Sequence, residues 1–350
     1  MLRTLKSRRS ARLYAAALLA VAATALSSCA NSGGSGSEEG TIVFQPATES
    51  MAVLTQLGAF STDAFKDAGL DVDYNAPIPN AAQAAQSVTT GSDIAIVGSS
   101  GVLPGVAAGR DMVTVATLTK GPTTQITLRN DVIERLGLAE DASAEDKIKA
   151  LKGLKIALPQ PGSLTDVVTR EAFRLFGIDA DKDMTIRPIT EPTALVTAVR
   201  EGQVDGYAFS APTSVQPVAE GYGSVWVSLN EVPELAELPF IDVVTSKTFL
   251  KERRDDVVKF VKVLQESAQV LADDPDSVKE SIQKKYFAEL EPNLFDLSWE
   301  FSLPTAQNGI EPSKVGFDAL VTMTENQTGE SVDVSFDDVY DLSVLEELGD

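Results

Sequence analysis

From Thr41 onward, short β-branched runs alternate with longer segments whose apolar residues recur at helical spacing, and this alternation constrains the fold more than any other feature. The first such run is 41–44, and the segment after it, 51–68, has the periodicity of a helix. Further strands are predicted at residues 72–74, 94–97, 113–118, 125–128, 155–158, 185–189, 206–209, 225–228 and 242–245. After Ser246 only helices are predicted, notably over residues 249–272, 276–286 and 312–327. Alternation of this kind predicts a layered α/β fold.

An internal repeat lies within this pattern. Residues 93–109 align without a gap with residues 205–221, and each segment begins with an aspartate and ends with a glycine. Both segments follow a helix-like stretch, and both combine a buried strand, a small polar loop and a helix. The repeat predicts two similar lobes with a cleft between them; the alternative is chance similarity between generic α/β units.

The lobe limits follow from the shortest path of the chain. We expect residues 41–122 and 244–350 to form lobe I and residues 123–243 to form lobe II, with the helical tail packed on lobe I. The chain then crosses between the lobes twice, near residues 120–122 and near residues 240–246. Two extended crossings form a hinge.

The N-terminus predicts export and lipidation. Residues 1–12 carry five basic residues and no acid, and residues 13–26 are almost wholly Ala, Leu and Val, which is typical of a signal peptide. Small residues then lead to Cys29, the only cysteine, in a pattern that resembles a lipobox. We therefore predict a signal peptide over residues 1–28 and a lipidated flexible tether over residues 29–40. The alternative is an ordinary signal peptide with an incidental cysteine.

Composition argues against several classes of function. Removing residues 1–28 takes away five basic residues and no acid, so the formal charge changes from −22 to −27 and nucleic-acid binding is not expected. The chain has no histidine, which is the usual general base and the commonest metal ligand. It also lacks a Walker motif, a nucleophile elbow and a second cysteine. We therefore predict no metal site, no cofactor and no enzymatic activity.

Four small polar loops follow predicted strands. In open α/β sheets ligands bind beyond the carboxyl ends of the strands, so these loops supply the candidate ligand contacts. The candidates are Gln45, Ala47, Thr48, Ser99, Ser100, Gly162, Ser163, Leu164, Thr165, Ser210 and Thr213. In the third loop, Ser163 and Asp166 have the spacing of a helix N-cap, and plain capping is the alternative explanation of that pattern. Asp242 is a further candidate for a cationic or hydroxylated ligand, or else an exposed carboxylate.

Three segments carry a resemblance to a known family. They are residues 91–100 (GSDIAIVGSS), 154–166 (LKIALPQPGSLTD) and 192–206 (PTALVTAVREGQVDG). Over residues 41–300 the chain resembles the solute-binding lipoproteins of ABC importers, in the branch that contains nitrate, sulfonate, taurine and thiamine-pyrimidine-precursor binders. This resemblance implies a two-lobed periplasmic-binding-protein type II fold that delivers a small molecule to a permease and its ATPase. The four loops contain no Arg or Lys, which departs from a firmly anion-binding site.

The predicted function is an extracytoplasmic substrate-binding lipoprotein of an ABC importer, a monomer held at the cell membrane through a lipid on Cys29. Two alternatives remain open. One is a secreted hydrolase whose nucleophile is Ser99, Ser163 or Ser210, activated by Lys120 or Lys155. The other is a lipoprotein that senses the ligand instead of importing it. The sequence does not identify the ligand.

Overall fold

The computed structural model describes residues 40–46, 48–78 and 80–349. Cys29, the predicted signal peptide, the tether as far as residue 39 and the candidate Ala47 lie outside these residues. In the part that the structure describes, no helix is both long enough and apolar enough to span a bilayer.

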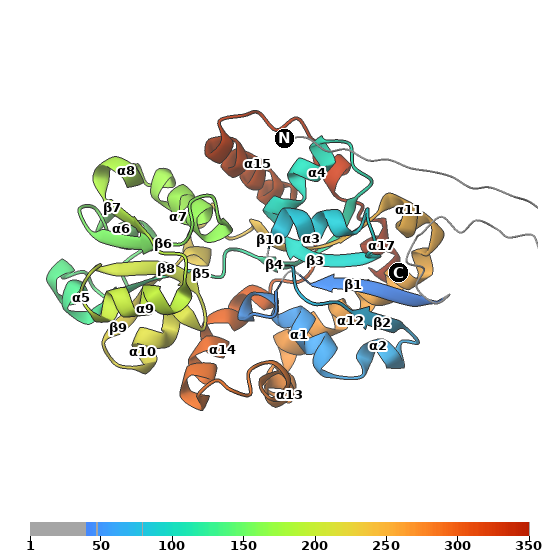
Figure 1. The fold of residues 1–350 in the computed structure, drawn as a ribbon, viewed down its shortest axis with the longest axis horizontal. Coiled ribbons are helices and arrows are strands. Elements are labelled where there is room, and N and C mark those ends of the chain that lie inside the picture. The colour runs from blue at the N-terminus through green and yellow to red at the C-terminus, as the bar shows by residue number, and fades with distance from the viewer. Residues whose placement is uncertain (1–39, 47, 79, 350) are drawn as a thin grey trace, which may run out of the picture. The chain divides into compact units, whose positions relative to one another are not determined.

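The described residues form two mixed sheets, which confirms the predicted α/β class (Figure 1). The first sheet has the order β2-β1-β3-β10-β4, in which β10 runs antiparallel to both of its neighbours and the other strands run parallel. Its strands are β1 (Thr41–Pro46), β2 (Asp71–Tyr74), β3 (Ile94–Gly98), β4 (Val113–Lys120) and β10 (Pro239–Thr245).

The second sheet repeats this topology with the order β7-β6-β8-β5-β9, and here β5 is the antiparallel strand. Its strands are β5 (Thr124–Arg129), β6 (Lys155–Leu158), β7 (Thr185–Pro188), β8 (Gly206–Ser210) and β9 (Gly223–Ser228). Every strand predicted from the sequence is present, with ends that differ by at most three residues. The β-branched runs identify strands well because their side chains pack on both faces of a buried sheet.

The two copies of the internal repeat occupy equivalent places in the two sheets. The first copy contains β3, η2 (Ser99–Gly101) and α4 (Leu103–Ala107). The second contains β8, η3 (Thr213–Val215) and α10 (Gln216–Ala219). In both sheets the repeated strand lies between the first parallel strand and the antiparallel strand.

The aspartate that begins each copy makes the same pair of contacts. Asp93 Oδ2 accepts the N–H of Val43 at 2.8 Å, and the Asp93 N–H donates to Val43 O at 2.8 Å. In the second sheet, Asp205 Oδ2 accepts the N–H of Lys155 at 2.8 Å, and the Asp205 N–H donates to Lys155 O at 2.8 Å. Each aspartate therefore ties the repeated strand to the first parallel strand of its sheet.

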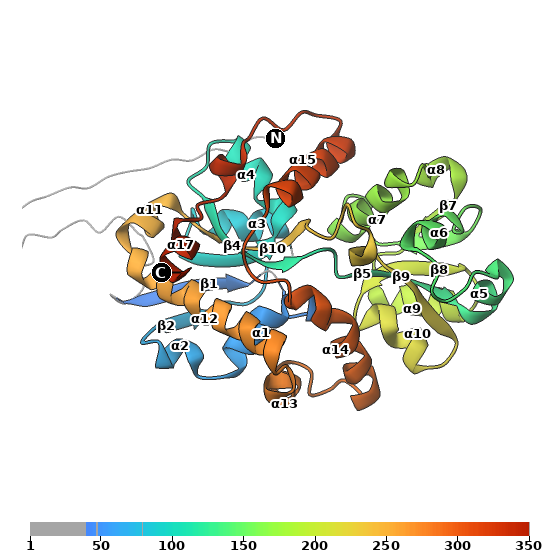
Figure 2. The same ribbon diagram turned by 180° about the vertical axis from the view of Figure 1, so that it is seen from behind.

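Helices cover both faces of each sheet, as Figures 1 and 2 show for the first one. On β3, Ile94 and Ile96 join the core beneath α1 (Leu54–Ser61) and α12 (Arg254–Asp273). The alternate residues Ala95 and Val97 join the core beneath α3 (Ala81–Ser87), as the period of two along a strand requires. In the second sheet, α7 (Leu164–Leu175) and α9 (Pro192–Arg200) pack in separate clusters.

The predicted helix over residues 51–68 is broken into η1 (Met51–Val53), α1 and α2 (Ala64–Asp67). The hydroxyls of Ser61 and Thr62 donate to the carbonyls of Gly58 and Ala59, and such side-chain bonds compete with helix continuation. The remaining helices are α5 (Asn130–Leu136), α6 (Ala144–Lys149), α8 (Ala180–Asp183), η4 (Leu229–Glu231), α11 (Lys247–Glu252), α13 (Asp276–Tyr286), α14 (Pro292–Ala306), α15 (Lys314–Thr328), α16 (Phe336–Val339) and α17 (Ser343–Gly349).

The chain passes from the first sheet to the second between β4 and β5, as predicted. It returns before β10, so the second crossing precedes residues 240–246, where we expected it. Residues 239–243, which the predicted limits placed in lobe II, belong to β10 of the first sheet, in which Pro239 pairs with β4 and residues 241–243 pair with both β3 and β4. Gly121, whose φ of 77° favours glycine, donates its N–H to Leu238 O at 2.9 Å. The two crossings therefore lie side by side.

We expect Asp93→Ala to lower the free energy of unfolding by about 1–3 kcal/mol, because the N–H of Val43 loses its acceptor. Asp93→Asn is the matched control, since it keeps an oxygen at this position. Urea denaturation followed by circular dichroism measures both variants. Equal losses in the two variants would show that the main-chain contact does not carry the effect.

Candidate functional site

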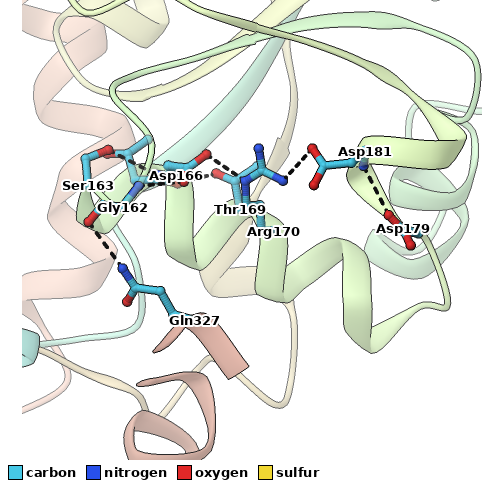
Figure 3. A network of polar contacts seen from close by, with 9 residues as sticks. Gly162, Ser163, Asp166, Thr169, Arg170, Asp179, Asp181 and Gln327 are labelled. Atoms are coloured by element: carbon cyan, nitrogen blue, oxygen red, sulfur yellow. Dashed lines mark hydrogen bonds and ion pairs between the residues drawn. The ribbon is translucent and has the colours of Figure 1, made fainter. Parts of the chain in front are cut away.

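The third loop forms the N-terminal cap of α7, as predicted (Figure 3). Ser163 Oγ accepts the N–H of Asp166 at 3.3 Å, and Asp166 Oδ2 accepts the N–H of Gly162 at 2.9 Å. The Asp166 side chain is buried within this arrangement. These contacts account for Ser163 and Asp166 as capping residues, so a role in ligand binding would fall to their neighbours.

Those neighbours, Leu164 and Thr165, are half-buried and occupy the first turn of α7. The first N–H groups of a helix have no acceptor within the helix, and the helix dipole makes this end electropositive. Among the described residues, the N–H groups of Leu164 and Thr165 have no hydrogen-bond acceptor. This end of α7 can therefore donate to an acceptor atom of a bound molecule.

Arg170, in the second turn of α7, is already paired (Figure 3). The Arg170 Nε donates to Asp166 Oδ1 at 2.8 Å, and its Nη1 donates to Asp181 Oδ1 at 3.1 Å. Arg170 thus fastens the first turn of α7 to α8. A ligand at this turn would meet main-chain dipoles and hydroxyls instead of an unpaired guanidinium.

The second loop adjoins the start of α7. A methyl group placed on Gly98 would lie 3.7 Å from Cδ2 of Leu164, so the space between the end of β3 and the first turn of α7 is about large enough for one methyl group. Ser99 is 1% exposed, and its buried hydroxyl lacks a hydrogen-bond partner, whereas Ser100 is half-buried. Of the two serines in this loop, Ser100 is the more accessible.

The side chain of Gln45 holds the first loop. Gln45 is buried, and its Nε2 donates to the carbonyls of Pro46 and Ala76 at 2.9 and 2.8 Å. Gln45 therefore fixes the exit of β1 against the segment after β2. Thr48 is half-buried, and η1 soon after it contacts α14.

The fourth loop lies beside the first crossing. Ser210 Oγ is 2.9 Å from Thr123 Oγ1, and the half-buried Thr213 accepts a hydrogen bond from Tyr207 Oη through its carbonyl. The η3 helix that begins at Thr213 also contacts α14. The second loop therefore lies beside the third. The first and fourth loops both lie near α14.

Sequence reasoning missed a buried polar group beside the fourth loop. Ser214 Oγ donates to Gln125 Oε1 at 2.5 Å, and Thr127 Oγ1 donates to Ser214 O at 2.6 Å. All three residues are buried. The available sign was a run of polar residues, Thr123 to Gln125, at the start of an otherwise apolar strand.

None of the three serines proposed as a nucleophile has a lysine amine as partner. Ser99 Oγ is unpartnered, Ser163 Oγ accepts a main-chain N–H and Ser210 Oγ pairs with Thr123. These contacts give no support to the serine and lysine hydrolase considered above. In residues 40–46, 48–78 and 80–349, no group of three or more acidic, Cys or His side chains is arranged to hold a metal ion.

Asp242 is neither exposed nor available to a ligand, contrary to both expectations. It lies in β10 with 0% of its surface exposed. Its Oδ1 accepts the hydroxyl of Thr117 at 2.7 Å, and its Oδ2 accepts the hydroxyl of Tyr340 at 3.5 Å. Burial raises the pKa of Asp242 to about 7, and the hydrogen bond from the hydroxyl of Thr117 acts in the opposite direction.

Comparisons with known proteins agree with this architecture. The model of the NMT1-like family matches residues 38–284. A curated protein of Bacillus subtilis (strain 168), named "Putative binding protein YtlA", is 26% identical over 281 residues, which are 73% of this chain and 80% of that protein.

Solved structures share the fold at low sequence identity. The periplasmic aliphatic sulphonate binding protein SsuA from Escherichia coli has a TM-score of 0.62 and 15% identity, over 83% of this chain and 90% of that chain. The periplasmic nitrate-binding protein NrtA from Synechocystis PCC 6803 has a TM-score of 0.60 and 14% identity, over 89% and 88%. A ligand-binding component of an ABC-type import system from Staphylococcus aureus has a TM-score of 0.62 and 12% identity, over 88% and 99%.

We expect Asp242→Asn to remove a pH dependence of stability. The folded protein keeps the Asp242 proton up to about pH 7, whereas the unfolded chain releases it near pH 3.8, so stability falls as the pH rises between these values. At about 1.4 kcal/mol for each pH unit, the loss reaches roughly 4 kcal/mol at pH 8. Asparagine carries no such charge, so the variant should gain stability relative to the wild type as the pH rises from 5 to 8.

Urea denaturation at pH 5, 6, 7 and 8 measures this difference. Asp111→Asn, at an exposed aspartate, is the control for the loss of one negative charge. If the stabilities of Asp242→Asn and the wild type run parallel across this range, Asp242 is already ionised at pH 5.

Proposed function

Because the chain belongs to the NMT1-like family, we propose that it is the extracytoplasmic substrate-binding component of an ABC importer. It captures a small solute between its two sheets and delivers the solute to a permease with its ATPase. The names of similar proteins, which include a binding protein, sulphonate- and nitrate-binding proteins and an import component, support this role.

The observation that carries the proposal is the meeting of two strand-end loops from different sheets. A methyl group added to Gly98, at the end of β3, would lie 3.7 Å from Leu164 Cδ2 in the first turn of α7, so these two parts of the chain lie beside each other. Ligands of open α/β folds bind at such carboxyl ends, where helix N-termini donate hydrogen bonds. The free N–H groups of Leu164 and Thr165 and the half-buried Ser100 then form one side of the site. Thr48, Ser210 and Thr213 are proposed to complete it.

The donors at this site favour a solute with exposed acceptor oxygens. Main-chain N–H groups and hydroxyls bind a sulfonate, a nitrate-like anion or a neutral carbonyl compound, and the helix dipole assists negative charge. We propose reversible binding with no covalent step, since no serine of the four loops is paired with a lysine amine.

We further propose that Cys29 carries a lipid that holds a monomer at the outer face of the cell membrane. The proposal rests on the N-terminal pattern of five basic residues, an apolar stretch and small residues before Cys29. Two acyl chains give stable anchoring, whereas one chain gives only marginal binding.

A panel of alkanesulfonates, nitrate and pyrimidines tests ligand binding by thermal shift. A solute at a hundred times its dissociation constant should stabilise the protein by about 2.7 kcal/mol. We expect Ser100→Phe to weaken binding of that solute at least about tenfold by filling the site, while Thr89→Phe, on an exposed turn, leaves binding unchanged. No shift with any compound of the panel, or equal binding by both variants, would contradict the proposal.

Fractionation of expressing bacteria tests the lipid anchor. The wild-type chain should sediment with membranes and incorporate radiolabelled fatty acid, and Cys29→Ser should remove the label and release the protein. An unchanged membrane fraction in Cys29→Ser, with no label in the wild type, would leave the N-terminus as an ordinary signal peptide.

A further inference from the structure

The N-terminal end of α15 packs against the second crossing, at residues 237–239. A methyl group on Gly316 would lie 1.9 Å from Glu237 O and 3.1 Å from Pro239 Cδ, so only glycine allows this approach. Beyond Gly316, the side chains of Phe317, Leu320 and Met323 belong to a buried cluster that also contains residues of both sheets. The N-terminal half of α15 is therefore fixed beside the hinge.

The other end of α15 reaches the candidate ligand loop. Gln327 Nε2 donates to Gly162 O at 3.4 Å, as Figure 3 shows. Asn326 Nδ2 donates to Glu171 Oε2 at 3.3 Å, and Glu171 is itself held by Arg174. Two amides thus connect α15 to the loop before α7 and to the second turn of that helix.

A gap lies between the C-terminal end of α15 and the start of α7. It has a volume of about 390 Å³ and is lined by α7, its preceding loop and α15. Gly162 and Gln327 on its rim are exposed, so the amides of Asn326 and Gln327 bridge it at the surface. Both hydrogen bonds across the gap are longer than the usual 2.9–3.0 Å, and bonds of that kind are easily broken.

We propose that Asn326 and Gln327 are positioning residues, which make α15 a strap between the hinge and the ligand loop. Gln327 lies about 16 Å along the helix from Gly316, so a rotation at the crossings moves α7 past the far end of α15 and little at the near end. The strap holds residues 160–171 in the arrangement in which the loops meet, and its release lets the sheets separate. This inference rests on the proposed function and concerns a helix outside the matched residues 38–284.

Hydrogen exchange of the ligand-free full chain tests the strap. In the double variant Asn326→Ala with Gln327→Ala, amides within residues 160–171 should exchange about five- to tenfold faster, as expected for the loss of two weak hydrogen bonds. Exchange within residues 316–323 should stay unchanged, the melting temperature should fall by only a few degrees, and the radius of gyration from small-angle scattering should increase.

Gln307→Ala is the matched control. It also removes an amide bonded to a main-chain carbonyl, at 2.8 Å from Nε2 to Leu271 O, but it does not link the two sheets. This control should leave exchange within residues 160–171 at the wild-type rate. Gln327→Glu, which preserves volume and places a carboxylate against Gly162 O, should give the local effect of the double variant.

An unchanged exchange rate within residues 160–171 would overturn the proposal. A faster exchange rate over the whole chain, in both the double variant and Gln327→Glu, would also overturn it. All of these measurements are made without a solute. A protein that shows the local effect but binds no compound of the panel would therefore refute the proposed function and leave the strap in place.

Discussion

The pairing of an aspartate with the main chain of a neighbouring strand fixes where the candidate loops lie. Asp93 in the first sheet and Asp205 in the second each bond the N–H and the carbonyl of one residue in the first parallel strand. A slip of one residue would turn every side chain of the strand to the opposite face. By setting this register, the pair places the ends of β1 and β3, or of β6 and β8, at one edge of each sheet. The four loops begin at those edges.

The centre of the first sheet contains a buried carboxylate, that of Asp242, whose burial is energetically unfavourable. A buried carboxylate loses its hydration, and Asp242 recovers part of that loss from the hydroxyls of Thr117 and Tyr340. Tyr340 follows α16 and also forms a β-bridge with Thr114 of β4. It therefore contacts both β4 and the neighbouring strand β10, which contains Asp242. Ser99 of the second loop directly follows β3, in which Val97 is the partner of Asp242. Ionisation of Asp242 would therefore act close to a candidate loop.

The strands, the repeat and the cap at Ser163 were predictable because each follows from local chemistry: buried β-branched runs, an aspartate at a strand start, and an N-cap spacing. The limits of the second crossing were not, since residues 239–245 become a central strand only through pairing with β3 and β4. The burial of Asp242 depends on the same pairing. The hydrogen bonds of α15 join residues more than 150 positions apart, and a local sequence pattern cannot predict contacts over that separation.

Charge limits what the proposed site can hold. The chain without residues 1–28 carries a formal charge of −27, which opposes the approach of an anion, and Arg170 is committed to Asp166 and Asp181. An anion at the first turn of α7 would be stabilised by the helix dipole and main-chain N–H groups, a contribution of about 0.3–2 kcal/mol from the dipole. A dianion would need more compensation than this turn supplies. Under the proposed function, the site thus favours a neutral or singly charged solute that presents oxygens to α7.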